Sequence, residues 1–177
     1  MGLLRKLFGG QTMAALTVGT KAPDFTLKAI DGKEFSLSEQ LAKGPVVLAF
    51  FKVSCPTCQY AFPFFERLHK AYGQNGVKIV GISQNAARDT AAFQKQFGVT
   101  FPVLLDELDA YPVSNAYGLT NVPTLFWIAA DGEIEVSAVG WLKKEFEDVN
   151  RRMAEHGKVP LATVFQPGED VRDFRAG

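Results

Sequence analysis

Cysteine and histidine are both scarce in this 177-residue chain, which contains two of each. Two cysteines are too few for the disulfide framework that small secreted domains use in place of a large core. This chain needs no such replacement, because 47% of its residues are apolar, enough for one globular domain with a substantial core. The cysteine pair is therefore more typical of a catalytic or metal-binding site than of a structural bridge.

Neither sign of charge is in excess, since 19 Lys and Arg residues balance 19 Asp and Glu residues. The basic residues are scattered along the chain, whereas nucleic-acid-binding domains usually carry a basic patch or stripe. No nucleic-acid partner is therefore expected. No apolar run approaches the ~20 residues that a membrane-spanning helix needs, so no membrane span is expected either.

The two ends of the chain differ from its middle. Residues 1–12 are basic and then apolar, as in a signal peptide, but Gly9 and Gly10 interrupt what should be the apolar segment. We expect a flexible N-terminal extension at 1–12, a single domain at 13–157 and a C-terminal arm at 158–177. A cytoplasmic location is expected, with membrane association or export through the N-terminal segment as the alternative.

The expected C-terminal arm has no periodic pattern, but it carries four apolar residues that could anchor it. They are Val164, Phe165, Val171 and Phe174. Burying one such side chain stabilises a fold by roughly 1.5 to 3 kcal/mol. We therefore expect an irregular arm packed on the domain rather than a free tail.

The order of predicted elements indicates an α/β domain with a parallel crossover. In chain order these elements are a hairpin at 22–37, a short helix after Ser36, a strand at 46–51, a helix at 55–72, a strand at 77–82, a helix at 89–97, a strand hairpin at 124–139 and a helix at 144–156. The strand at 46–51 is apolar without alternation, which is typical of a central strand covered on both faces.

The two cysteines lie where this central strand gives way to a helix. Pro56 suits the first position of a helix, which places Cys55 at the N-cap. There, unpaired backbone N–H groups and the helix dipole favour the thiolate form of its sulfur. Cys58 follows one turn later on the same face, within reach of a disulfide. Cys55 can then attack a substrate disulfide, and Cys58 can resolve the mixed disulfide.

Zinc binding is the main competing interpretation, because a Cys-x-x-Cys pair is also half of many zinc sites. The remaining ligands would have to come from His69 and His156. His69 lies roughly 16 Å from Cys58 along the predicted helix, too far to share a metal ion. His156 alone leaves the set one ligand short. Redox chemistry is therefore favoured over zinc and over a structural disulfide, and no metal is expected.

Several motifs resemble the thioredoxin superfamily. The run Cys55–Cys58 followed by Pro63 resembles the active-site helix of that superfamily. Val122–Pro123 before an apolar strand resembles its cis-proline loop. Segments 18–25 and 101–106 resemble the redoxin branch, which includes TlpA-like oxidoreductases and the alkyl hydroperoxide reductase and thiol-specific antioxidant group. The resemblance implies a thioredoxin-like fold, in which helices flank a central mixed β-sheet and a β-hairpin lies near the N-terminus.

The same resemblance implies which residues surround the cysteines. It implies a cis bond between Val122 and Pro123, packed against the cysteine pair, and a Val122 backbone that pairs with an extended substrate segment. Pro56 and Thr57, between the cysteines, are further candidates for substrate binding. Lys52 is a candidate for stabilising the thiolate.

The sequence departs from its relatives at positions that matter for chemistry. Many relatives carry tryptophan immediately before the first cysteine and a carboxylate six residues before it, where this chain has Ser54 and Ala49. No buried acid is thus expected there to take the proton of the second cysteine. Peroxiredoxins carry a proline seven residues and a threonine three residues before the attacking cysteine, where this chain has Leu48 and Lys52.

The favoured function is a thiol–disulfide oxidoreductase that exchanges a Cys55–Cys58 dithiol or disulfide with protein or small-molecule disulfides. Expected partners are protein thiols and disulfides or a thioredoxin-type reductant, no cofactor is expected, and the chain is expected to be a monomer or weak dimer. Two alternatives stay open. One is a peroxiredoxin-like thiol peroxidase with Cys55 peroxidatic and Cys58 resolving. The other is a redox-sensing module without catalysis.

Overall fold

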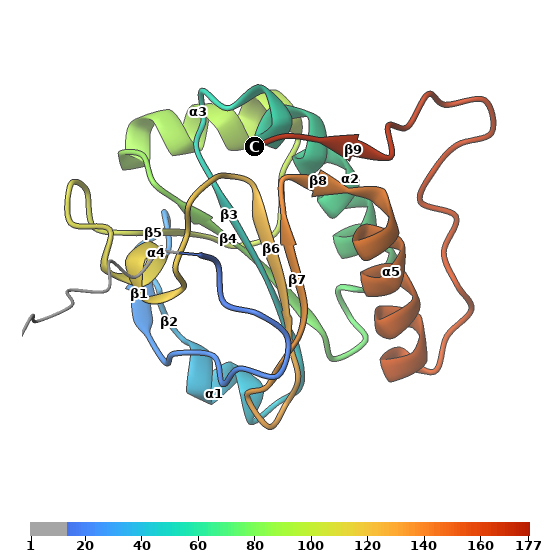
Figure 1. Cartoon of the computed structure of the whole chain (residues 1–177), viewed down its shortest axis with the longest axis horizontal. Helices are drawn as coiled ribbons and strands as arrows, with labels where there is room; N and C mark the ends of the chain where they lie inside the picture. The colour runs from blue at the N-terminus through green and yellow to red at the C-terminus, as the bar shows by residue number, and fades with distance from the viewer. Residues whose placement is uncertain (1–13) are drawn as a thin grey trace, which may run out of the picture.

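A five-stranded mixed β-sheet forms the centre of the structure, a computed structural model that describes residues 14–177 (Figure 1). Its strands, in the order in which they pair, are β5 (Val103–Leu105), β4 (Lys78–Ser83), β3 (Val46–Phe51), β6 (Thr124–Ile128) and β7 (Ile134–Val139). The pairs β3–β4 and β4–β5 are parallel, whereas β6 is antiparallel to both β3 and β7. The mixed sheet predicted from the resemblance is confirmed.

Helices cover both faces of this sheet. They are α1 (Leu37–Leu41), α2 (Pro56–Tyr72), α3 (Ala87–Phe97), α4 (Pro112–Ala116) and α5 (Lys143–Gly157). Val47, Ala49 and Phe51 of β3 face a core shared with α2, α3 and α5. The intervening β3 residues face a second core shared with α1 and α4. Because both faces of β3 are buried, its sequence is apolar throughout, as predicted.

The predicted N-terminal hairpin is present but short. Strands β1 (Thr26–Lys28) and β2 (Glu34–Ser36) pair in antiparallel register and cover the α1 side of the sheet. Their turn passes through Gly32 at φ 83°, a conformation that glycine adopts without steric cost. The side chain of Ser36 then caps α1 by accepting a hydrogen bond from the Glu39 N–H at 3.4 Å.

After α5, residues 158–177 run back along α2 and α5, and Figure 1 shows them as the red segment that loops out at the right and returns through β9 to the C-terminus near the top centre. They end in β9 (Phe174–Arg175), which pairs with β8 (Trp141–Leu142). Val164 is buried, and Phe165 and Val171 pack against the α2–α5 core. The expectation that Phe174 is an anchor is wrong, because Phe174 is 60% exposed in β9.

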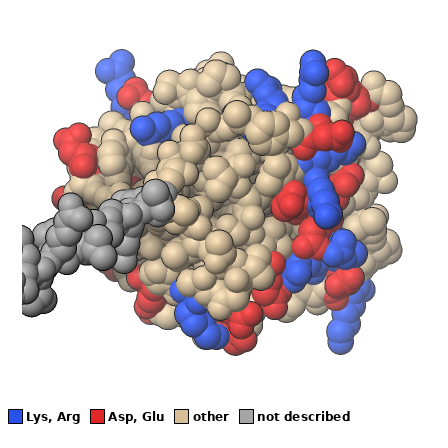
Figure 2. All heavy atoms as spheres, in the orientation of Figure 1, with Lys and Arg blue, Asp and Glu red and all other residues tan. Residues whose placement is uncertain are grey.

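Charged side chains of both signs alternate on the surface. In Figure 2, blue and red side chains intermingle along the side where α5 lies, and a broad area without charge occupies the middle of the view. Along α5, Arg152 pairs with Glu135 and Asp148, and Arg151 pairs with Asp148 and Glu155.

Within residues 14–177, no helix is both long enough and apolar enough to cross a membrane. The extension predicted at residues 1–12 lies outside the described part of the chain.

Candidate active site

Cys55 occupies the N-cap of α2, the position that Pro56 predicted. Its backbone is extended (φ −79°, ψ 116°), and Pro56 is the first residue of the helix. The Cys55 Sγ accepts a hydrogen bond from the backbone N–H of Cys58 at 3.1 Å. The sulfur is thus held against the positive end of a 17-residue helix, which favours a negative charge on it.

Cys58 lies one turn inside the helix and is inaccessible to solvent (0% exposed), whereas Cys55 is partly exposed. Burial raises the pKa of the Cys58 thiol well above its ordinary range, and its hydrogen bond with Cys55 raises it further. Cys58 therefore keeps its proton at neutral pH. Both cysteines are free thiols in this structure.

The loop before β6 closes over the cysteines from another part of the chain. The Val122–Pro123 peptide bond is cis, as the resemblance implied. The thiol of Cys55 donates a hydrogen bond to the Val122 carbonyl at 3.2 Å, although 67 residues separate the two in sequence. Thr124 fixes the loop by donating its hydroxyl to the Asn121 carbonyl at 2.7 Å. The Val122–Pro123 loop therefore lies directly beside the two cysteines.

The loop that leads from β3 to Cys55 is held by side-chain amides. The backbone N–H of Val53 donates to Asn85 Oδ1 at 2.9 Å, and Gln59 Nε2 donates to the Val53 carbonyl at 2.9 Å. The N–H of Cys55 donates to the Lys52 carbonyl at 3.2 Å. The Lys52 side chain is exposed, and its role toward the thiolate stays a prediction.

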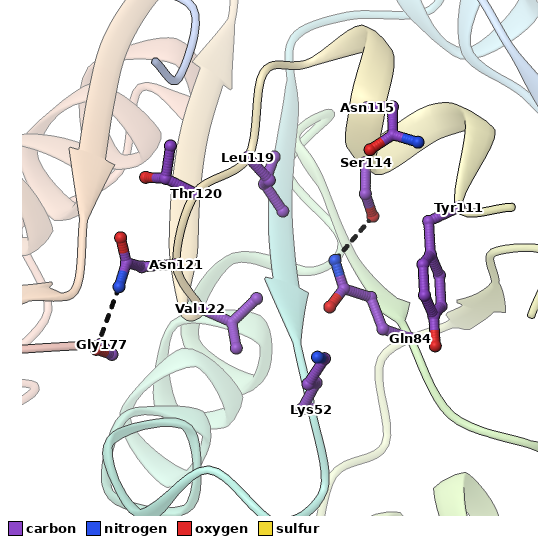
Figure 3. Close-up of a pocket in the computed structure, with 10 residues that line it drawn as sticks. All are labelled: Lys52, Gln84, Tyr111, Ser114, Asn115, Leu119, Thr120, Asn121, Val122 and Gly177. Atoms are coloured by element: carbon purple, nitrogen blue, oxygen red, sulfur yellow. Dashed lines mark hydrogen bonds between the residues drawn. The ribbon is translucent and has the colours of Figure 1, made fainter. Parts of the chain in front are cut away.

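A polar cavity of about 380 Å³ adjoins the Val122 loop (Figure 3). Lys52 and Val122 line it on the cysteine side, and Gln84 and Ser114, joined by a hydrogen bond of 2.9 Å, line another wall. Neither Gln84 nor Ser114 was predicted from the sequence as a site residue. Their side chains come from separate segments, after β4 and in α4, so no local motif links them.

The last residues of the sequence also reach this site, which the sequence analysis missed. The Thr57 hydroxyl donates to the Ala176 carbonyl at 2.6 Å, and Asn121 Nδ2 donates to the Gly177 carbonyl at 3.3 Å. The second of these hydrogen bonds is drawn in Figure 3. Because 119 residues separate Thr57 from Ala176, no spacing in the sequence could have indicated the contact.

Among the described residues, the two buried carboxylates belong to Glu66 and Asp106, and both accept hydrogen bonds from groups other than the cysteines. Glu66 accepts hydrogen bonds from the Thr100 N–H and hydroxyl, and Asp106 accepts from the N–H groups of Val113 and Ser114 at the start of α4. Ala49 is fully buried where many relatives have an acid. A proton leaving Cys58 must therefore be taken by another group.

Two further features bear on metal binding. Among residues 14–177, no group of three or more His, Cys, Asp and Glu side chains is arranged to hold a metal ion. His69 packs edge-on against Phe101 at 5.9 Å, and His156 lies beside Gly44 and Gly76.

Comparisons with known proteins agree with this geometry. Residues 18–137 match the AhpC/TSA family. The chain is 34% identical over 132 residues to the thiol-disulfide oxidoreductase ResA of Geobacillus thermodenitrificans, covering 74% of each chain. It is also 34% identical over 140 residues to the protein of that name from Geobacillus kaustophilus, covering 78% of each.

Solved structures give the same fold. A thiol:disulfide interchange protein from Chlorobium tepidum superposes with a TM-score of 0.64 at 26% identity, covering 78% of this chain and 99% of that one. The thioredoxin domain of a thiol-disulfide oxidoreductase from Bacteroides vulgatus superposes with a TM-score of 0.70 at 19% identity, covering 78% and 99%, which supports the fold alone.

Proposed function

The chain belongs to the AhpC/TSA family and is a thiol–disulfide oxidoreductase with a thioredoxin-like fold, and from this premise we propose that Cys55 is its attacking thiol and Cys58 its resolving thiol. The observation that carries this assignment is the unequal setting of the two sulfurs. Cys55 is partly exposed at a helix N-cap, where a thiolate is favoured, whereas Cys58 is buried and protonated.

Exchange then proceeds in two steps. In the reducing direction, the Cys55 thiolate attacks one sulfur of the substrate disulfide, which forms a mixed disulfide and releases the other sulfur as a thiolate. Cys58 loses its proton and attacks Cys55 Sγ, so that the Cys55–Cys58 bond forms and the mixed disulfide breaks. Two electrons and two protons pass to the two substrate sulfurs. The oxidising direction is the same sequence reversed.

Substrate binding is assigned to the surfaces that flank Cys55. The backbone of Val122 is half-buried and adjoins the attacking sulfur, which suits pairing with an extended segment of a protein substrate. Pro123 belongs to that loop, and Pro56 and Thr57, between the two cysteines, are assigned to the same binding surface. Thiol–disulfide oxidoreductases act on protein thiols and disulfides, which identifies the class of partner.

The peroxidase alternative is less well supported than exchange. The relatives are named as thiol-disulfide oxidoreductases, and this chain has Leu48 and Lys52 where peroxiredoxins carry proline and threonine. Leu48 is fully buried in the core on the α1 side of the sheet. We expect exchange with disulfides to be much faster than oxidation by hydrogen peroxide.

Serine variants test the order of the two cysteines. Cys55→Ser removes the nucleophile and should reduce the exchange rate by at least ~100-fold, whereas Cys58→Ser removes only resolution and should trap a mixed disulfide. Mass spectrometry after incubation with a disulfide-containing protein measures the trapped adduct. An adduct on Cys58 in the Cys55→Ser variant, with none in the converse variant, would reverse the assignment.

Three expectations from the sequence stay predictions. A cytoplasmic location, with membrane association or export as the alternative, is tested by cell fractionation. A monomer or weak dimer is tested by sedimentation. An antioxidant role, which the resemblance to the thiol-specific antioxidant group implies, is tested by the peroxide sensitivity of cells that lack the protein.

A further inference from the structure

Residues 173–177, called the strap below, lie across the mouth of the active site. At their start, the Lys143 N–H donates to the Asp173 carbonyl at 2.9 Å. β9 then pairs with β8, in register Leu142 with Phe174 and Trp141 with Arg175. The guanidinium of Arg175 lies 4.5 Å from the centre of the Tyr60 ring, on α2. The strap is therefore directed along α2 toward the cysteines.

The tip of the strap rests on the groups assigned to substrate binding. The Ala176 carbonyl accepts a hydrogen bond from Thr57, and the Gly177 carbonyl accepts one from Asn121. Gly177 approaches so closely that a Cβ added to it would lie 2.5 Å from the Val122 carbonyl oxygen. The strap tip thus occupies the space directly beside the Val122 backbone.

The Val122 edge is otherwise available for strand pairing. Within the part of the chain that the structure describes, neither its N–H nor its carbonyl pairs with another main-chain group, and the carbonyl accepts only the Cys55 thiol. An extended polypeptide that adds to this edge would have to lie where Ala176 and Gly177 now lie. A compact disulfide faces no such requirement, because Cys55 remains partly exposed with the strap in place.

The contacts that hold the strap are separate from those that hold the rest of the arm. β9 has only two residues, and the side chain of Phe174 is 60% exposed. The preceding residues are held independently of it, since Arg67 binds both carboxylate oxygens of Glu169 at 2.8 Å. The Arg172 N–H also donates to the Tyr60 hydroxyl at 2.9 Å. The strap can therefore lift while the rest of the arm stays bound.

We propose that the strap determines which disulfides reach Cys55. In its docked position it admits compact disulfides and excludes extended polypeptides from the Val122 edge, and its displacement opens that edge to protein substrates. This inference rests on the proposed function, because it assumes that Cys55 is the attacking thiol.

The first test deletes residues 173–177 and compares two substrates. Single-turnover reduction of insulin and of bis(2-hydroxyethyl) disulfide is followed by acid quench and thiol alkylation. If the strap is docked about nine-tenths of the time, its deletion should raise the second-order rate constant for insulin by ~10-fold. The rate constant for the compact disulfide should change by less than about 2-fold, since that disulfide does not use the Val122 edge.

A point variant keeps the test valid even if the deletion disturbs folding. Arg175→Ala removes the contact with Tyr60, and losing an exposed cation–π contact from a strap that is nine-tenths docked should raise the insulin rate constant by about 2- to 4-fold. Arg172→Ala is the matched control, because the Arg172 side chain is 68% exposed and pairs only with the exposed Asp170. It should leave both rate constants unchanged.

The outcomes separate the strap from the active site. Unchanged insulin rates in the deletion and in Arg175→Ala would overturn the inference. So would a lower insulin rate with an unchanged rate for the compact disulfide, because the strap would then be part of the binding platform. If the intact chain reduces neither disulfide, the proposed function fails instead.

Discussion

At the scale of single residues, the two cysteines differ chiefly in their access to water. Cys58 is buried under the first turn of α2 and surrounded by apolar side chains, so its ionised form is strongly disfavoured. Cys55 is three residues away but at the helix end, where the backbone N–H of Cys58 donates a hydrogen bond to its sulfur. One turn of helix therefore gives two chemically identical side chains different roles.

Alkylation kinetics test this difference. With the reduced protein at pH 7, iodoacetamide should label Cys55 and leave Cys58 unmodified, because burial raises the Cys58 pKa above the ordinary value of 9.0 and only thiolates react. Peptide mapping after timed labelling measures both rates. In urea the two cysteines should react at similar rates. Faster labelling of Cys58 in the folded protein would contradict the assignment.

The raised pKa also has a consequence for stability, with a definite sign. As the pH rises above about 9, the unfolded chain loses the Cys58 proton while the folded chain retains it. This group therefore lowers the free energy of unfolding at alkaline pH and has no effect near neutrality.

At the scale of secondary-structure elements, Tyr72 joins the end of α2 to both α5 and the arm. Its hydroxyl donates to Asn150 Oδ1 at 2.6 Å and accepts from the Ala162 N–H at 2.7 Å, while Asn150 Nδ2 donates to the Ala162 carbonyl at 3.0 Å. Tyr72 and Asn150 are buried. The Tyr72 hydroxyl, the Asn150 side-chain amide and the Ala162 backbone therefore satisfy one another's hydrogen bonds.

Tyr72→Phe should lower the free energy of unfolding by about 1–3 kcal/mol, because it leaves Asn150 Oδ1 and the Ala162 N–H without their partner. Urea denaturation measures the change. Tyr111→Phe is the control, since the Tyr111 hydroxyl makes no hydrogen bond within residues 14–177. Equal effects of the two substitutions would show that the Tyr72 network contributes nothing.

The arm is also held by an ion pair that depends on pH. Hydrogen bonds from Arg67 and from the Gln166 N–H lower the pKa of Glu169 to about 2. Because the folded pKa lies below the ordinary value of 4.5, the stabilisation is fully present above about pH 4.5 and is lost as the pH falls toward 2. Both side chains are partly exposed, so the effect should not exceed ~1 kcal/mol.

Glu169→Gln should reduce stability at pH 7 and have a much smaller effect near pH 2, where about half of the native Glu169 carboxyl groups are protonated. Urea denaturation of the native protein and the variant at several pH values between 2 and 7 measures the difference in their free energies of unfolding. Asp170→Asn, at the exposed neighbouring residue, is the matched control. A Glu169→Gln effect of the same size at pH 2 and pH 7 would exclude an ionic contribution.

The elements differ in how far the sequence could predict them. The run at 46–51 is apolar because both faces of β3 are covered, and Pro56 marks the start of α2, so both were predictable from adjacent residues. By contrast, β8 and β9 have two residues each and exist only because they pair with one another across about 30 residues. Strands of two residues are too short to produce a periodic pattern in the sequence. For the same reason Phe174 was wrongly expected to be buried.

At the scale of the whole molecule, the candidate site was only partly predictable. Cys55 and Cys58 were predictable because they are three residues apart at the start of a helix. Val122–Pro123 was predicted only through the resemblance. The contacts of Thr57 with the strap depend on how the arm folds back over α2. No local signal encodes that path.

Deleting residues 160–177 should lower the melting temperature by at least about 5 °C, because 1 kcal/mol corresponds to about 2–4 °C in a chain of this size. The deletion removes the buried side chain of Val164, the Tyr72 contact and the Arg67–Glu169 pair. Calorimetry measures the shift, and reduction of a compact disulfide checks that the chemistry survives. Deleting only 173–177 should have a smaller effect. An unchanged melting temperature for the longer deletion would show that the arm does not stabilise the domain.

The position of Gly177 against Val122 also affects how the protein should be handled in the laboratory. Any residues joined after Gly177, such as an affinity tag or a fluorescent fusion partner, would begin beside the Val122 carbonyl, which accepts the Cys55 thiol. They could compete for the Val122 edge or pull the strap away from it, and either would change the measured specificity. Assays of substrate preference should therefore use protein that carries its purification tag at the other end or has had it removed.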